Sequence, residues 1–380
     1  MQHRSHPLQS PVPGTARHIE SFHYGPAEAP GKVYIQASLH ADELPGMLVA
    51  WHLKQRLAEL ENAGRLRHQI VLVPLANPIG LEQVLMDTPL GRYQLESGEN
   101  FNRHFVDLAL QVGDAVEAQL AGDPQQNLVL IRQALRQALA AERPTTQLQA
   151  LRLTLQQLAC DADMVLDLHC DFEAVEHLYT TPEAWPKVEP LARYLGSQAS
   201  LLATDSGGQS FDECFSLVWW ELEQRFEGRF PIPDGSFSVT LELRGQGDVN
   251  HALASRDCQA LINYLTHHGA IDGSADAQPQ LLYPATPLAA VEPVATPDGG
   301  VLVFCAQPGE YLEAGQLIAE VIDPITDRVT AVHNRNAGLL YARSLRRMAT
   351  AGMVIAHVAG TEAFRSGYLL LREAPCACTN

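Results

Sequence analysis

Two short apolar runs that each end in a histidine constrain the fold of this chain more than any other feature. Residues 32–39 form a β-favouring run that follows a Pro-Gly pair, and His40 comes directly after it. Residues 162–168 form a second apolar run, which ends at His169. Such runs are typical of buried strands. Because sites in open α/β sheets gather at the carboxyl ends of strands, we expect the two histidines to share one site.

A helix is expected after the first histidine. Apolar residues recur at helical spacing between residues 44 and 60, and Pro45 is tolerated in a first helical turn. His40 and Glu43 stand three residues apart at the entrance of this helix, so their side chains can point the same way. A histidine nitrogen and a carboxylate oxygen are normal zinc ligands, and His169 would be the third. Three protein ligands leave a position free for water, which is the arrangement of catalytic zinc.

The cysteines do not suggest a structural zinc site. The chain has seven cysteines, and none has a spacing that indicates a fourth ligand. Cys160 and Cys170 flank the second apolar run, whereas Cys376 and Cys378 lie in a tail expected over residues 374–380.

A third strand-like segment carries a carboxylate among apolar neighbours. Residues 237–245 alternate in the manner of a strand, and Glu242 stands between two leucines. An ionised group in apolar surroundings is costly, so Glu242 is either paired with an arginine or held for chemistry. Beside a zinc-bound water it would act as general base and then as proton donor. An outward-facing glutamate on a sheet edge is the alternative. Asp167 or Asp171, two residues to either side of His169, would orient a ligand.

Two further motifs are suited to binding a carboxylate. Asn102 and Arg103 place an amide beside a guanidinium, and Arg92 lies ten residues before Asn102. Such groups hold carboxylates through charge-assisted, bidentate hydrogen bonds. Surface Asn-Arg pairs are common, so the value of this pair depends on the other motifs.

The ordered set H-x-x-E, N-R, L-D-L-H and T-L-E-L-R resembles the zinc carboxypeptidase superfamily, and within it the succinylglutamate desuccinylase and aspartoacylase branch. The resemblance implies an α/β fold with a mixed twisted sheet and flanking helices. It also implies one zinc ion per chain, held by His40, Glu43 and His169. Ala41 stands where many deacylase relatives have glycine, and T-L-E-L-R leans toward the carboxypeptidase form, so the substrate stays open.

The same resemblance assigns roles to the remaining motif residues. Asn102 and Arg103 correspond to residues that bind the substrate carboxylate, and Arg244 is expected to bind substrate with them. Glu242 corresponds to the catalytic base, and Arg92 to the arginine that polarises the scissile carbonyl.

The expected function is that of a zinc-dependent amidohydrolase, in which Glu242 assists attack of zinc-bound water and an acyl group leaves a small N-acylated amino acid. A zinc carboxypeptidase that acts on short peptides is the first alternative. A catalytically silent binding protein of the same fold is the second alternative.

Composition agrees with a small-molecule enzyme. The chain has 380 residues, 46% of them hydrophobic, and a formal net charge of -18. This acidity argues against nucleic-acid and anionic-membrane partners. No apolar run is long enough to cross a membrane and no signal-peptide core is present, so a cytoplasmic location is expected. Homo-oligomers are an open option.

The domain organisation follows from changes in composition. Residues 1–275 are predicted to form the catalytic domain, with a helical insertion over about 106–160 that contains a hairpin of helices at 124–142 and 146–160. Residues 276–285 are predicted to be a linker.

Residues 286–373 are predicted to form a small all-β domain. The octets at 314–321 and 351–358 match, which suggests two copies of a four-strand unit in a barrel-sandwich-like domain. The segment resembles lipoyl and biotinyl carriers, but no lysine follows Lys187 to hold such a cofactor. In several deacylase relatives a C-terminal β domain narrows access to the zinc, so the resemblance implies a cap that admits small acylated amino acids.

Overall fold

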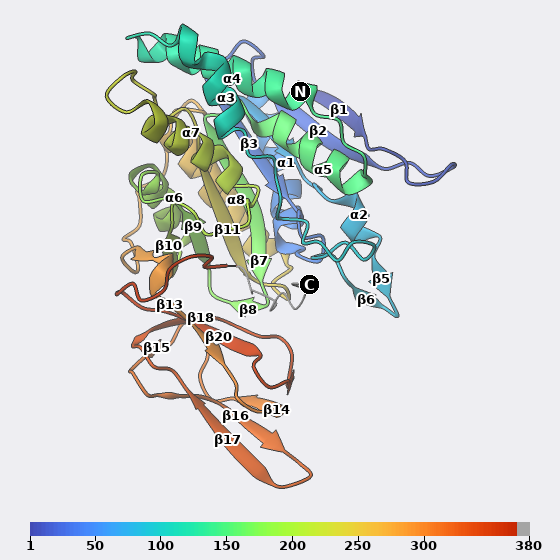
Figure 1. Cartoon of the computed structure of the whole chain (residues 1–380), viewed down its shortest axis with the longest axis vertical. Helices are drawn as coiled ribbons and strands as arrows, with labels where there is room; N and C mark the ends of the chain where they lie inside the picture. Colours follow the sequence, from blue (N-terminus) through green and yellow to red (C-terminus); the bar gives the residue numbers. More distant parts are fainter. Residues whose placement is uncertain (371–380) are drawn as a thin grey trace, which may run out of the picture.

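A nine-stranded mixed sheet forms the centre of the larger part of the molecule (Figure 1). The computed structural model describes residues 1–370. In order across the sheet, the strands are β1 (Gln2–Pro7), β2 (His18–Tyr24), β4 (Gln69–Val73), β3 (Lys32–Ala37), β7 (Met164–Asp171), β11 (Phe237–Gly245), β9 (His177–Thr180), β10 (Ala199–Leu202) and β12 (Thr286–Pro287). This mixed sheet confirms the predicted fold class.

The central strands run parallel, and this places the predicted site at one edge of the sheet. Strands β4, β3, β7 and β11 are mutually parallel, whereas β9 runs antiparallel to β11. Ala37 at the end of β3 pairs with Leu168, and Glu242 pairs with His169. The carboxyl ends of β3, β7 and β11 therefore meet, as expected for an α/β sheet.

Helices cover both faces of the sheet. The helices α1 (Pro45–Asn62), α6 (Trp185–Leu195) and α8 (His251–His267) pack on one face with Val33 and Ile35 of β3. Tyr34, which points the other way, packs with α3 (Ala109–Val116), α4 (Pro124–Ala141), α5 (Gln147–Ala159) and α7 (Glu213–Phe226). The apolar residues of the buried strands thus serve two cores, which explains their continuous runs. No helix within residues 1–370 is long and apolar enough to span a bilayer.

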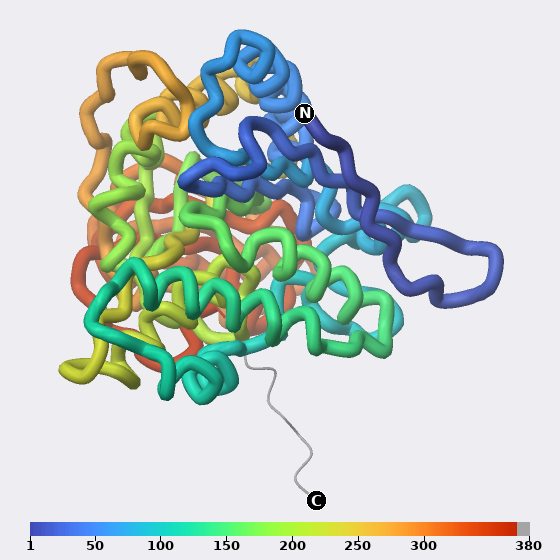
Figure 2. Tube along the Cα trace, turned by 90° about the horizontal axis from the view of Figure 1, so that it is seen from above, coloured from blue at the N-terminus to red at the C-terminus, as the bar shows by residue number. Residues whose placement is uncertain are grey.

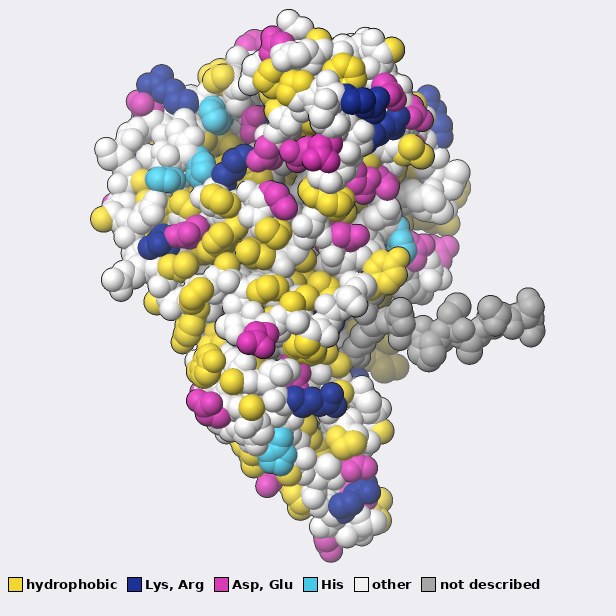
Figure 3. All heavy atoms as spheres, turned by 60° about the vertical axis from the view of Figure 1, so that its left-hand side comes forward, with side chains coloured by type: hydrophobic (Ala, Val, Ile, Leu, Met, Phe, Trp, Pro, Cys, Tyr) yellow, Lys and Arg dark blue, Asp and Glu magenta, His cyan; other side chains and the backbone are white. Residues whose placement is uncertain are grey.

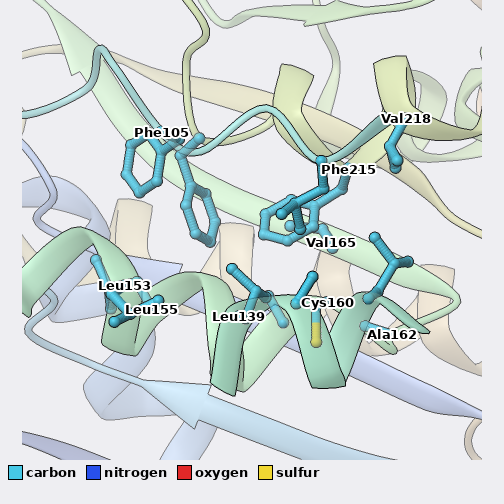
Figure 4. Packing of buried hydrophobic residues seen from close by; sticks show 14 of the residues in the cluster. Phe105, Leu139, Leu153, Leu155, Cys160, Ala162, Val165, Phe215 and Val218 are labelled. Atoms are coloured by element: carbon cyan, nitrogen blue, oxygen red, sulfur yellow. The ribbon is translucent and has the colours of Figure 1, made fainter. Parts of the chain in front are cut away.

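The predicted helical hairpin is confirmed as α4 and α5. Asp123 and Thr146 cap their first turns through side-chain oxygens, as N-cap residues do. Leu139 of α4 and Leu155 of α5 are fully buried in one cluster, together with Phe105. Figure 4 shows these side chains facing one another across the layer. The hairpin is therefore part of the core of the larger unit.

Short elements complete the larger unit. They are α2 (Pro78–Leu81), the two-stranded ribbon of β5 (Val84–Leu85) and β6 (Thr88–Pro89), the 3-10 turn η1 (Glu117–Gln119), and β8 (Glu173–Ala174). The hairpin of β1 and β2 extends outward from one edge of the molecule (Figure 2).

The C-terminal strands form two facing antiparallel sheets. One sheet has the order β13-β20-β18-β15, and the other has the order β17-β16-β14-β19. The elements are the 3-10 turn η2 (Leu288–Ala290), β13 (Val291–Ala295), β14 (Gly300–Phe304), β15 (Tyr311–Leu312), β16 (Leu317–Asp323), β17 (Arg328–His333), β18 (Gly338–Arg343), β19 (Met348–Ala349) and β20 (Val354–Ala359). A common core that includes Leu302, Ile318 and Ile355 lies between them.

The internal repeat explains this sandwich. The repeated octets lead into β16 and β20, which lie in opposite sheets. Gly315 and Gly352 occupy equivalent turns with φ of 82° and 78°, a conformation that favours glycine. The short strand of each copy pairs with a strand of the other copy. Strand β15 of the first copy pairs with β18 of the second, and β19 of the second copy pairs with β14 of the first. The two copies are therefore interlocked.

Two pairings join the smaller sandwich to the larger unit. Strand β12 extends the nine-stranded sheet beside β10, and β8 pairs with β18. Figure 3 shows the sandwich as a narrower lobe. The division at 276–285 and the extent of the β domain over 286–373 remain predictions. The predicted tail at 374–380, with Cys376 and Cys378, lies outside the described residues.

Candidate metal centre

The ends of β3 and β7 bring His40, Glu43 and His169 together, in agreement with the sequence motifs. Ligand atoms of these three buried side chains all lie within 4.8 Å of one another, so the group can hold a metal ion. Nδ1 of His40 lies 2.9 Å from Oε1 of Glu43, and Nδ1 of His169 lies 2.8 Å from its Oε2. Two imidazole nitrogens and a carboxylate fit Zn²⁺, and they also accept other divalent ions.

A tight loop between β3 and α1 places the first two ligands. Ser38 adopts φ of 65°, which turns the chain sharply at the end of the strand. The Glu43 amide then donates to the His40 carbonyl at 3.1 Å, and the Ala41 amide donates to the Gly91 carbonyl at 3.0 Å. A side chain at Gly91 would lie 2.7 Å from the Ala41 carbonyl carbon, so this close approach requires glycine.

Each histidine is oriented by a hydrogen bond on its outer nitrogen. Nε2 of His169 lies 2.9 Å from Oδ2 of Asp167, and the other Asp167 oxygen accepts a bond from Gln36 at 3.0 Å. Nε2 of His40 lies 2.8 Å from Oδ1 of Asn100. Because these oxygens accept, Nε2 carries the proton in both rings and Nδ1 faces the centre. Of the two aspartates considered from the sequence, Asp167 therefore orients the ligand.

The charges of the three side chains depend on one another. Burial, and then the charge of Arg92, lowers the pKa of His40 to about 4, so this imidazole is neutral at pH 7. Burial also lowers the pKa of His169, but Asp167 and Glu43 outweigh this and raise it well above its ordinary value. Burial raises the pKa of Glu43, yet the two histidines hold it well below its ordinary range. Without a metal ion, His169 and Glu43 therefore form a buried ion pair.

Glu242 lies beside this group on β11. It pairs in register with His169 on one side and with His177 on the other. Its Oε2 atom is buried without a hydrogen-bond partner among residues 1–370. Burial, and then the charge of Glu43, raises its pKa well above the ordinary value, although His169 and Arg92 oppose the shift. In the described part of the chain this carboxylate has no arginine partner of its own, which favours a chemical role over a structural one.

Arg92 reaches the centre from the segment that follows β6. Its Nη1 atom lies 3.2 Å from Nδ1 of His40 and 3.3 Å from Oε1 of Glu43. Burial lowers its pKa, but Glu43 and the neighbouring carboxylates outweigh this and raise it above the ordinary value. The guanidinium therefore stays charged beside the ligand atoms.

Asn102 and Arg103 lie on the segment that packs against the loop before α7. Oδ1 of Asn102 accepts a hydrogen bond from the Phe211 amide at 2.7 Å. Nη1 of Arg103 donates to the Asn102 carbonyl at 2.6 Å. Its Nε is buried without a partner, and no ion pair to Arg103 forms within residues 1–370. Burial lowers the Arg103 pKa, although Glu213 and Asp212 oppose this.

Arg244 lies in a cluster of ion pairs next to the candidate site. Its φ of 64° and a shift in strand register between Glu242 and Gly245 turn its side chain out of the alternating pattern. The guanidinium contacts Glu176 and Asp257 of α8. Arg244 therefore has two carboxylate partners of its own, and its role in substrate binding stays a prediction.

Two contributors were missed from the sequence. Asn100 orients His40, and its position two residues before Asn102 was the only signal that could have found it. Arg152 of α5 donates to Glu99 at 2.8 Å and to the Asn100 carbonyl at 2.8 Å. The helical hairpin therefore braces the segment that carries Asn102, which no local pattern indicates.

A mixed sheet with a His2Glu group at its carboxyl edge defines an α/β protein with a candidate metal centre. A family model, the succinylglutamate desuccinylase/aspartoacylase catalytic domain, matches residues 29–268. The chain belongs to this family, as its motifs predict.

Solved structures show the same fold. A structure from Shewanella amazonensis SB2B, described as a succinylglutamate desuccinylase/aspartoacylase family protein, shares 24% identity with a TM-score of 0.84, covering 94% of this chain and 98% of that one. A structure from Shewanella frigidimarina NCIMB 400 shares 24% identity with a TM-score of 0.83, covering 94% and 97%. The product-bound ectoine utilization protein EutE (DoeB) from Ruegeria pomeroyi shares 15% identity with a TM-score of 0.65, covering 94% and 94%. Comparison with curated protein sequences gave no match.

Proposed function

We propose that this protein is a zinc-dependent amidohydrolase that removes an acyl group from a small N-acylated amino acid. The observation that carries the proposal is the convergence of His40, Glu43 and His169 within 4.8 Å, next to the unpaired carboxylate of Glu242. Membership of the desuccinylase and aspartoacylase family supports the same reaction class.

The donor set fits a zinc ion. Nδ1 of each histidine and the carboxylate of Glu43 already face one another, and the outer nitrogens are held by Asn100 and Asp167. Oriented imidazoles of this kind are characteristic of metal ligands. A zinc ion bound here would supply Lewis acidity, which polarises a carbonyl group and lowers the pKa of a water molecule.

Glu242 is proposed to hold and move the proton. Its buried Oε2 has no partner in the described residues, and burial raises the pKa of this carboxyl group well above its ordinary value, which suits a group that accepts a proton and returns it. In the hydrolysis, that proton would come from water and pass to the amine that leaves.

Three residues are proposed to bind the substrate around this centre. Arg92 would donate to the carbonyl oxygen of the scissile amide, since its Nη1 lies within 3.3 Å of ligand atoms. Arg103 and Asn102 would hold the carboxylate of the amino acid. This role suits Arg103 because its charge is half-buried and has no carboxylate partner among residues 1–370.

Metal content and a substrate screen test the proposal together. Protein purified without chelator is expected to contain about one zinc ion per chain, and His169→Ala is expected to contain almost none. His18→Ala, which removes an exposed histidine on β2, is the matched control and should keep its zinc. N-acylated amino acids should then be hydrolysed by the loaded protein.

Two results would contradict the proposal. One is the absence of zinc from the unmodified protein after purification and after reloading. The other is a zinc-loaded protein that releases C-terminal residues from peptides of several lengths and ignores N-acylated amino acids, because that would identify a carboxypeptidase.

A further inference from the structure

An exposed phenyl ring stands at the rim of the metal centre. Phe172 follows the ligand His169 by three residues, and 40% of its surface is exposed. The guanidinium carbon of Arg92 lies 5.6 Å from the centre of this ring. Nη1 of the same guanidinium lies 3.2 Å from Nδ1 of His40. A large apolar surface thus remains open to solvent next to the ligand atoms.

The backbone that carries this ring is held by hydrogen bonds on both sides. The Phe172 amide donates to Oδ1 of Asp171 at 2.7 Å, and its carbonyl accepts from the Gln246 amide at 3.1 Å. A side chain at Gly245 would lie 2.8 Å from the Phe172 carbonyl oxygen, so the two loops touch closely. The next residue, Glu173, lies in β8 and pairs with β18. The ring is therefore presented by a segment held on both sides, which keeps the entropic cost of binding against it low.

The charges around the ring disfavour a carboxylate there. Arg343 and Arg347 come from the C-terminal sandwich, but both donate to Glu173 at 2.6 Å. The carboxylate of Asp171 is adjacent in sequence and bonded to the Phe172 amide. A second substrate carboxylate at this place would face Asp171, and the guanidinium of Arg92, 5.6 Å from the ring, already contacts Glu43. The rim at Phe172 thus differs from the surroundings of Arg103, where a half-buried cation has no carboxylate partner.

We propose that Phe172 is a specificity-determining residue that contacts an apolar group of the substrate. The substrate class is then an N-acyl amino acid with a single carboxylate and a bulky apolar group, and dicarboxylic compounds such as succinylated or aspartyl derivatives are disfavoured. This inference rests on the proposed function. The apolar group is either the amino-acid side chain or the acyl chain, since both are attached next to the scissile amide.

The test compares substrates across variants of the zinc-loaded protein. N-acetyl-phenylalanine carries the apolar group on the amino acid, N-hexanoyl-glycine carries it on the acyl side, and N-acetyl-aspartate and N-succinyl-glutamate carry two or more carboxylates. We expect kcat/KM for one of the first two to exceed that of the last two by about tenfold or more. Phe172→Ala should lower that preferred value by about tenfold through KM, and leave the value for N-acetyl-aspartate nearly unchanged. Phe172→Leu should restore most of the loss.

Two controls keep the inference distinct from the proposed function. Trp220→Ala removes an aromatic ring of matched exposure, 39%, on α7 and should leave the preference unchanged. Calorimetric binding of free phenylalanine, hexanoate and aspartate gives a readout that needs no turnover, and Phe172→Ala should weaken only the apolar ligand. Equal losses for all substrates in Phe172→Ala, or a preference of the unmodified protein for the dicarboxylic compounds, would overturn this inference while the hydrolase proposal stands. If the unmodified, zinc-loaded protein hydrolysed none of these substrates, the proposed function would be overturned, and the inference about Phe172 would fall with it.

Discussion

The metal centre and the ion cluster around Arg244 share strand β11 and use the same residue types in opposite ways. In the cluster, Arg244 contacts Glu176 and Asp257, and Arg256 of α8 contacts both acids as well. At the metal centre, Glu242 lies only two residues before Arg244, yet Oε2 of its carboxylate has no partner among residues 1–370.

The two regions at the end of β11 therefore have different roles: the ion cluster stabilises the fold, and the metal centre is suited to chemistry. A buried acid that contacts arginine contributes to the fold, because each charge compensates the burial of the other. Burial raises the pKa of Glu242 well above its ordinary value, and its Oε2 has no partner among residues 1–370, so this carboxyl group is available to exchange a proton. The left-handed backbone at Arg244 makes the separation possible, because it prevents that guanidinium from following Glu242 into the site.

The most direct test of this comparison replaces one buried glutamate by glutamine in each region. Glu242→Gln should lower kcat by about 10²–10⁴-fold with zinc still bound, because general acid-base catalysis contributes about that much. Glu176→Gln removes a buried carboxyl group from the ion cluster and should leave turnover close to that of the unmodified protein. Steady-state kinetics with parallel metal analysis measures both. Similar losses of kcat in the two variants would show that the regions are not functionally distinct.

The pH dependence of zinc binding tests whether a proton is displaced from a ligand at the metal centre. The pKa of His169 is raised by Asp167 and Glu43 against the effect of burial, so zinc must displace a proton from Nδ1. Zinc affinity should then rise about tenfold per pH unit while His169 is protonated in the metal-free chain. The same raised pKa means that the ion pair stabilises the metal-free fold below the ordinary histidine pKa, and that this stabilisation is lost as the pH rises through the raised value.

Asp167→Asn is the matched variant for this titration. It keeps an acceptor for Nε2 of His169 but removes the charge that raises the histidine pKa. Competitive chelator titrations from pH 6 to 8 should show a flatter pH dependence and an affinity about tenfold weaker at the upper end. An unchanged slope would mean that the proton is not displaced from His169.

Substitutions in the ion cluster are expected to change activity least and stability most. Asp257→Asn should lower the free energy of unfolding by about 3 kcal/mol, because Arg244 loses a buried partner. Hydrolysis by the folded variant should persist. Asp114→Asn, which removes an acid that is 66% exposed and pairs with Arg225, should change the free energy of unfolding by less than about 1 kcal/mol. Urea denaturation followed by circular dichroism measures both, and a silent Asp257→Asn would contradict the structural role of the cluster.

Local sequence predicted the elements of the fold well where the signal was short-range. The strand at 237–245 and the hairpin of α4 and α5 follow from alternation, helical spacing and capping residues within each segment. The ligands His40 and His169 were found because each ends a buried strand, and parallel strands bring their carboxyl ends to one edge. The interlocking of the two C-terminal repeats was beyond such reasoning, since pairing of β15 with β18 joins residues of different copies.

The sequence by itself determined the class of fold, the His2Glu group, the family and the presence of a carboxylate on the strand at Glu242, because these depend on residue type, order and spacing. Only the tertiary structure decided which partners those residues meet. Asn100 orients His40 across 60 positions of the chain, Arg244 turns to α8 instead of the site, and Phe172 stays exposed beside Arg92. Contacts between residues far apart in sequence arise from packing, and no local pattern encodes them.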